Sequence, residues 1–82
     1  MKVEVVKKPC TYILHIQEPL DTMQKLMTVF GELKLFVNGF EMYRYRNGDA
    51  MVIVKCQVEE EGVKKLKEKI EKISNVKTVE LH

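Results

Sequence analysis

The sequence predicts an α+β domain with the element order β-α-β-β-α-β, the split βαβ or ferredoxin-like arrangement. Three observations support it: period-two alternation over residues 10–17, two segments with apolar residues three and four apart, and an Asn-Gly dipeptide between two further strand-like segments. Because crossover connections are right-handed, both helices should lie on one face of a four-stranded antiparallel sheet. The opposite face would then be open.

The composition is that of one small globular domain, with 82 residues, 45% of them hydrophobic and 32% charged. A net charge of +2 is too small for the clustered basic surface of a nucleic-acid binder. No apolar run approaches the roughly 20 residues that span a bilayer, and the charged start at Met1–Glu4 disfavours a signal peptide. Two cysteines make no disulfide framework, so we expect a cytoplasmic chain with reduced thiols. Residues 10–82 should form the domain, and residues 1–9 an extension or an extra strand.

The first strand is predicted over residues 10–17, with a break in regular pairing at Pro9. Tyr12, Leu14 and Ile16 would face the core, and the residues between them the open face. The first helix should begin at Asp21, which forms a capping-box arrangement with Gln24. Gly31 is the expected terminator. The predicted buried stripe consists of Met23, Leu26, Met27 and Phe30.

The middle of the chain predicts a hairpin between strands at residues 36–46 and 50–58. Asn47-Gly48 would form its two-residue turn, with positive φ at both positions. Phe40 and Met42 are expected to be buried. The second helix should start near Glu59–Glu61, where acidic residues favour the positive end of the helix dipole.

The second helix carries three Glu-to-Lys pairs spaced four residues apart, a favourable order on a helix surface. They are Glu60/Lys64, Glu61/Lys65 and Glu68/Lys72. Its expected buried stripe is Val63, Leu66, Ile70 and Ile73. Asn75 is a candidate cap, and residues 76–81 should form the last strand.

Alternation places an unusually apolar set of residues on the open face of the sheet. We interpret this set as a protein–protein interface, since a sheet face pairs readily with its symmetry mate and exposed apolar patches usually mark contacts. Half-exposed strand residues without any partner are the simpler alternative. The expected interface residues are Ile13, His15, Tyr43, Tyr45, Met51 and Ile53.

No motif for catalysis, metal binding or phosphate binding is found. Cys56 would face the core and His15 the open face, so they cannot form a nucleophile–base pair. Metal-ligand spacings are absent, and the scattered glycines form no phosphate-binding loop. Alternation sends Tyr43 and Tyr45 to the face opposite Arg44 and Arg46, which disfavours a base-stacking sheet. We therefore expect no catalytic residues, no metal and no cofactor.

Two stretches carry a resemblance to a known family. The loop-to-helix segment EPLDTMQKLM and the strand segment LFVNGFEM, both between Tyr12 and Cys56, are similar to corresponding segments of the ACT domain. Within that family, the sequence most resembles the short regulatory subunit of acetolactate (acetohydroxyacid) synthase. The last helix and strand match in kind but not in distinctive residues.

The resemblance implies a homodimeric, non-catalytic subunit that activates a large thiamine-diphosphate-dependent catalytic subunit in branched-chain amino-acid biosynthesis. It also implies that a branched-chain amino acid binds where the first strand meets the first helix. The matching residues here are Gln17, Glu18, Pro19, Leu20, Asp21, Thr22, Asn38 and Gly39. Free backbone amides at the helix start would favour the effector's carboxylate.

Leu20 stands where the family has glycine, and Glu18 and Asp21 add negative charge. A subunit that activates without sensing an effector is therefore an alternative. Asn38 is equally well explained as a strand-edge residue beside a bulge at Gly39. The fold also leaves open a ligand-binding or enzymatic domain of unknown substrate and, more remotely, an RNA-binding sheet.

Overall fold

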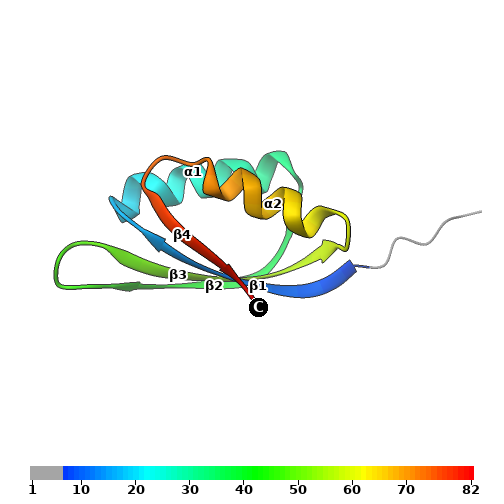
Figure 1. Cartoon of the computed structure of the whole chain (residues 1–82), viewed down its shortest axis with the longest axis horizontal. Helices are drawn as coiled ribbons and strands as arrows, with labels where there is room; N and C mark the ends of the chain where they lie inside the picture. Colours follow the sequence, from blue (N-terminus) through cyan, green and yellow to red (C-terminus); the bar gives the residue numbers. More distant parts are fainter. Residues whose placement is uncertain (1–6) are drawn as a thin grey trace, which may run out of the picture.

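The computed structural model describes residues 7–82 and has the predicted element order (Figure 1). Four antiparallel strands form one sheet in the order β2-β3-β1-β4. Figure 1 shows α1 and α2 together on one side of this sheet, which confirms the ferredoxin-like prediction. The elements are β1 (Lys7–Ile16), α1 (Pro19–Glu32), β2 (Phe36–Arg44), β3 (Ala50–Glu59), α2 (Gly62–Glu71) and β4 (Val76–Leu81).

Strand β1 starts earlier than predicted, and Pro9 lies within it, opposite Gln57 of β3. The Thr11 amide donates to the His82 carbonyl on the β4 side. Pro9, two residues earlier, turns its nitrogen to the same side, beyond the end of β4. The missing N–H therefore removes no hydrogen bond from the β1–β3 ladder. Residues 1–6, which belong to the predicted extension or extra strand, lie outside the described residues.

The core fills the space between the helix layer and the sheet. The predicted β1 triplet of Tyr12, Leu14 and Ile16 is fully buried, as expected from its alternation. In the helices, Leu26, Phe30, Leu66 and Ile70 are buried, while Met23 and Val63 pack at the core edge. Ile73, which lies just after α2, also packs there. The remaining core residues lie on β3 and are Ala50, Val52, Val54, Cys56 and Val58.

Both predicted ends of α1 are wrong. Glu18 is the N-cap, with a left-handed φ of 47° and no side-chain cap bond, and Pro19 opens the helix. Proline is well suited there, because its missing N–H would have no helical partner. At the other end Gly31 stays helical, and Lys34 takes the left-handed position with φ 50°. The Leu35 amide reaches back to the Phe30 carbonyl over 3.0 Å, so a Schellman motif closes α1 without glycine.

The β2–β3 turn contains Asn-Gly as predicted but has a different geometry. Only Gly48 has positive φ, at 93°. Its amide bonds to the Tyr45 carbonyl over 3.1 Å, and the Tyr45 amide to the Asp49 carbonyl over 2.8 Å. The turn is thus a three-residue loop with glycine in the left-handed position, instead of a two-residue turn.

Around α2, the start and the predicted ion pairs differ from expectation. The helix begins at Gly62, after the three glutamates. Within residues 7–82, none of the three predicted Glu-to-Lys pairs lies within 4.0 Å; Glu60 instead pairs with Lys8 over 3.4 Å. Asn75 does not cap α2, whose C-cap is Lys72, but has a φ of 73° in the turn before β4.

The prediction that Phe40 and Met42 are buried is wrong, since they are 47% and 37% exposed. Both point to the helix side, but β2 is an edge strand that the helix layer does not fully cover. Together with Leu20, Met23 and Met27 they line an open apolar groove between α1 and β2. Met27, predicted to be buried, is 50% exposed for the same reason.

Candidate functional site

A polar pocket of about 340 Å³ lies where β1 turns into α1. Three separate turns meet there, because the carboxyl end of β1, the β2–β3 hairpin and the α2–β4 turn all lie at one end of the sheet. Ile16 pairs with Ala50 on one side and Val76 on the other, and Ala50 pairs with Arg44. The lining residues are Gln17, Glu18, Pro19, Arg44, Asn47, Gly48, Asp49 and Asn75.

Hydrogen bonds fix the β1–α1 turn on the pocket's inner side. The Gln17 amide donates to the Asn75 carbonyl over 2.7 Å, which ties this turn to the one before β4. The buried Thr22 hydroxyl donates to the Gln17 carbonyl over 2.6 Å. The Thr22 amide donates to the Glu18 carbonyl over 2.9 Å. Both backbone groups of Gln17 are therefore bonded, and the pocket wall is held rigidly.

The charges on the pocket wall are unequally paired. The Asp49 carboxylate forms an ion pair with Lys77 over 2.8 Å. The Asp49 backbone amide donates to the Asn47 side-chain oxygen over 3.0 Å. By contrast, neither Arg44 nor Glu18 has an ion-pair partner within 4.0 Å among residues 7–82. The pocket thus presents one guanidinium and one carboxylate that are available to a ligand.

Of the predicted effector residues, only part lies at this pocket. Gln17, Glu18 and Pro19 line the pocket. Thr22 lies beneath it, and Asp21 pairs with Lys25 over 3.2 Å on the helix surface. Since the Thr22 amide is already bonded to Glu18, it is not among the free amides at the helix start. Leu20 is 69% exposed and lines the neighbouring apolar groove.

Asn38 and Gly39 lie at the other end of β2. Gly39 pairs with Lys55, which pairs with Thr11, whereas the pocket is level with Ile16. Five residues of strand separate these levels, or about 17 Å. The register shifts between Val37 and Gly39, so the bulge expected at this point is present. Within a single copy of the chain, Asn38 therefore does not reach the pocket.

Sequence reasoning missed the pocket residues outside the β1–α1 turn. Arg44, Asn47, Asp49 and Asn75 come from distant parts of the chain. The available signal was the antiparallel pairing itself: the hairpin turn and the turn before β4 must lie beside the carboxyl end of β1.

The six predicted interface residues share the open face of the sheet. Ile13 lies opposite Ile53, and His15 opposite Met51, which pairs in turn with Tyr43. Tyr43 and Tyr45 are exposed, whereas the other four side chains are half-buried, namely Ile13, His15, Met51 and Ile53. The Tyr45 ring stacks on His15 with centroids 6.4 Å apart. Tyr43 donates to Glu41 over 2.7 Å, a hydrogen bond that raises the pKa of its hydroxyl.

The chain matches known proteins in structure but not in sequence. No protein-family model matches the chain, and no curated protein matches it in sequence. Among solved structures, the ACT domain of GTP pyrophosphokinase from Chlorobium tepidum superposes with a TM-score of 0.80 at 13% identity, over 94% of this chain and 100% of that domain. The chain has the fold of an ACT domain.

Two further structures with this fold come from different proteins. A formyltetrahydrofolate deformylase from Pseudomonas putida matches at a TM-score of 0.74 and 13% identity, over 92% of this chain but only 28% of the deformylase. The C-terminal domain of the MgtC protein from Mycobacterium tuberculosis matches at 0.72 and 7% identity, over 100% of this chain and 92% of that one. At identities this low, the structural similarity establishes the fold alone, and the function has to be inferred from the residues of this chain.

The ACT-like fold places the titratable residues as follows. Cys10 lies directly opposite Cys56 across β1 and β3, and both are free thiols. Cys56 is buried on the core side, while His15 lies on the open face, as alternation predicted. Among residues 7–82, no three His, Cys, Asp or Glu side chains gather closely enough to hold a metal ion. No helix in the described part of the chain is long and apolar enough to cross a membrane.

Proposed function

We propose that the chain is a non-catalytic regulatory module that binds a free amino acid in the pocket at the β1–α1 turn and acts on a partner enzyme. The observation that supports this most directly is the presence of unpaired Arg44 and Glu18 on the wall of one polar pocket. The ACT-domain fold supports it further.

A free amino acid matches the charges of this pocket. Its carboxylate would bind the Arg44 guanidinium, whose planar donors suit a bidentate contact. Its ammonium group would bind the Glu18 carboxylate, and the side-chain amides of Asn47 and Asn75 would supply further hydrogen bonds. The pocket of about 340 Å³ is large enough for a free amino acid. A branched-chain amino acid fits within that volume.

The test is thermal unfolding of the full chain with valine, leucine and isoleucine, each compared with acetate and ammonium salts at the same ionic strength. A ligand at a hundred times its Kd should stabilise the fold by about 2.7 kcal/mol. The variant Arg44→Gln should abolish this shift. Arg46→Gln, an exposed change in the same hairpin that does not line the pocket, should retain it. If no amino acid shifts the Tm, the effector proposal is wrong.

The proposed partner enzyme is the large catalytic subunit of acetolactate synthase in the cytoplasm, and the EPLDTMQKLM and LFVNGFEM resemblances support this choice. Thiamine diphosphate would belong to that subunit, and this chain would carry no cofactor. Adding the chain to the catalytic subunit should raise acetolactate formation. Activation that does not respond to any amino acid would favour a subunit that activates without sensing an effector. No activation would exclude this partner while leaving ligand binding untouched.

The proposed homodimer uses the open sheet face around Ile13, Met51 and Ile53. Sedimentation at tens of micromolar should show a dimer, and Ile53→Glu should dissociate it by burying an unpaired charge. Met27→Glu, placed in the apolar groove between α1 and β2, is the matched control. Dissociation by Met27→Glu alone would move the interface to that groove, and a monomeric native chain would contradict the proposal.

A further inference from the structure

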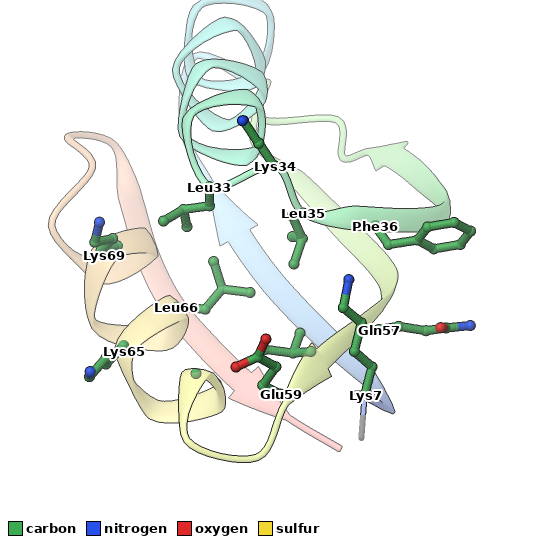
Figure 2. A pocket seen from close by; sticks show the side chains of 12 residues that line it. Lys7, Leu33, Lys34, Leu35, Phe36, Gln57, Glu59, Lys65, Leu66 and Lys69 are labelled. Carbon is green, nitrogen blue, oxygen red and sulfur yellow. The ribbon is translucent and has the colours of Figure 1, made fainter. Parts of the chain in front are cut away.

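A second pocket, of about 240 Å³, lies at the opposite end of the molecule (Figure 2). Its walls come from the segment after α1, the last residues of β3, the first turns of α2 and the start of β1. Lys7 and Glu59 pair at this end of the β1–β3 ladder, whereas Ile16 and Ala50 pair at the other. Nine residues of strand, or about 30 Å, separate this pocket from the one at the β1–α1 turn.

The floor of this second pocket is apolar. Figure 2 shows the side chains of Leu35 and Leu66 pointing toward one another, with Leu33 beside them and turned toward α2. Leu66 and Val58 belong to the hydrophobic core, so the pocket opens directly onto core side chains. Leu33 remains 39% exposed on its wall. A hydrocarbon group placed here would remove this apolar surface from water.

The rim of the pocket is basic. Lys7, Lys34, Lys65 and Lys69 line it, and all four are exposed. Within the described chain, none of them has an acidic partner within 4.0 Å, and the predicted Glu61–Lys65 pair does not form. Glu59 is the one acidic residue of the lining. Four positive charges against one negative charge leave the lining with a charge of +3.

We propose that this pocket binds an amphipathic carboxylate, an ionised head on a medium-length hydrocarbon chain. The cavity of about 240 Å³ is large enough for a hydrocarbon chain of several carbons, such as that of octanoate. The chain would lie on Leu33, Leu35 and Leu66, and the head would remain at the rim. Lysine suits this arrangement, since its flexible stem can follow a mobile head without a fixed bidentate geometry.

The basic rim and the apolar floor are both needed for this choice of ligand. An inorganic anion would leave the leucine floor exposed to water, and an uncharged hydrocarbon would leave four lysines without partners. This pocket shares no lining residue with the one at the β1–α1 turn, so the two ligands are tested independently.

Titration calorimetry of the full chain with octanoate, octanamide and acetate tests both requirements. Octanoate should bind, and octanamide and acetate should each bind at least about ten-fold more weakly. The octanoate affinity should also fall as salt is raised, because the head is solvent-accessible. If octanoate fails to bind, or octanamide binds equally well, the proposal is overturned.

Two pairs of variants locate the site. Lys65→Gln combined with Lys69→Gln should weaken octanoate binding by about ten-fold, which corresponds to about 1.4 kcal/mol. Lys64→Gln combined with Lys72→Gln removes the same charge from exposed positions outside the pocket and should leave binding within two-fold or so. Equal losses in both pairs would show a general charge effect and reject the site. Leu33→Gln, at an exposed floor position, should also weaken binding.

Discussion

The Tyr12 hydroxyl, in the middle of β1, donates a hydrogen bond of 3.0 Å to the Val63 carbonyl in the first turn of α2. The two residues are 51 positions apart in the sequence. Burial raises the pKa of this hydroxyl, so it stays protonated and remains a donor. This single bond links the central strand to the helix that supplies much of the second pocket's wall.

Tyr12→Phe should therefore destabilise the fold. The change removes the donor and with it the hydrogen bond to the Val63 carbonyl, at a cost of about 1–2 kcal/mol in the free energy of unfolding. Urea denaturation measures the loss. Tyr43→Phe is the control, since that hydroxyl bonds to Glu41 on the exposed face and its removal should change stability by less than about 0.5 kcal/mol. Equal losses of stability in the two variants would show that the Tyr12 hydrogen bond contributes no more to the fold than the exposed one.

Thr22→Val should loosen the turn that carries Gln17. Valine keeps the shape of threonine but cannot donate to the Gln17 carbonyl, so we expect a loss of about 1–2 kcal/mol. Thr22→Ser keeps the hydroxyl and should retain more of the stability. Thr28→Val removes an exposed hydroxyl that bonds to the Gln24 carbonyl and should be nearly neutral. A Thr22→Val protein as stable as the native chain would contradict this account of the turn.

Alanine at two glycines should have effects of opposite sign. Gly48 has a φ of 93°, which an L side chain rarely adopts, so Gly48→Ala should destabilise the hairpin by about 1 kcal/mol. Gly31 lies inside α1, and apart from its chain neighbours and the helix's own backbone no atom lies within 4 Å of the place that an added methyl group would take, so Gly31→Ala should stabilise by about 0.5–1 kcal/mol. Thermal unfolding of both variants decides the matter, and effects of the same sign would refute it.

Stability should fall above about pH 9 because of Cys56. Burial, with a smaller effect from Cys10, raises the pKa of this thiol from its usual 9.0 to about 11. Between these values the unfolded chain releases a proton that the folded chain retains, so the free energy of unfolding decreases as the pH rises. Urea denaturation at pH 7, 9 and 10 measures the slope.

Cys56→Val provides the control for that slope. It keeps an apolar side chain of similar size but removes the titrating thiol, so stability between about pH 9 and 10 should depend less on pH. Tyr12 adds a fall of the same sign at higher pH, because its ordinary pKa is 10.0 and burial raises it. Equal slopes in both proteins would exclude Cys56 as the cause.

Local sequence patterns were sufficient to predict the elements and their order. Alternation in β1 assigned Tyr12, Leu14 and Ile16 to the core because side chains of a strand point to opposite faces in turn. The same rule placed Ile13 and His15 on the open face. The ends of α1 could not be predicted in this way, since proline at its start and a left-handed Lys34 at its end replaced the more usual Asp and Gly signals.

The sequence by itself determined the topology, because periodicity, turn residues and right-handed connections are local or general properties of the chain. Only the tertiary structure decided which residues meet. Antiparallel pairing brings Arg44 and Asn75 to Glu18 and keeps Gly39 about 17 Å away along the strands. The partial cover that two helices give to four strands leaves Phe40 and Met42 exposed at the β2 edge. Pockets form from such long-range contacts, which no local pattern encodes.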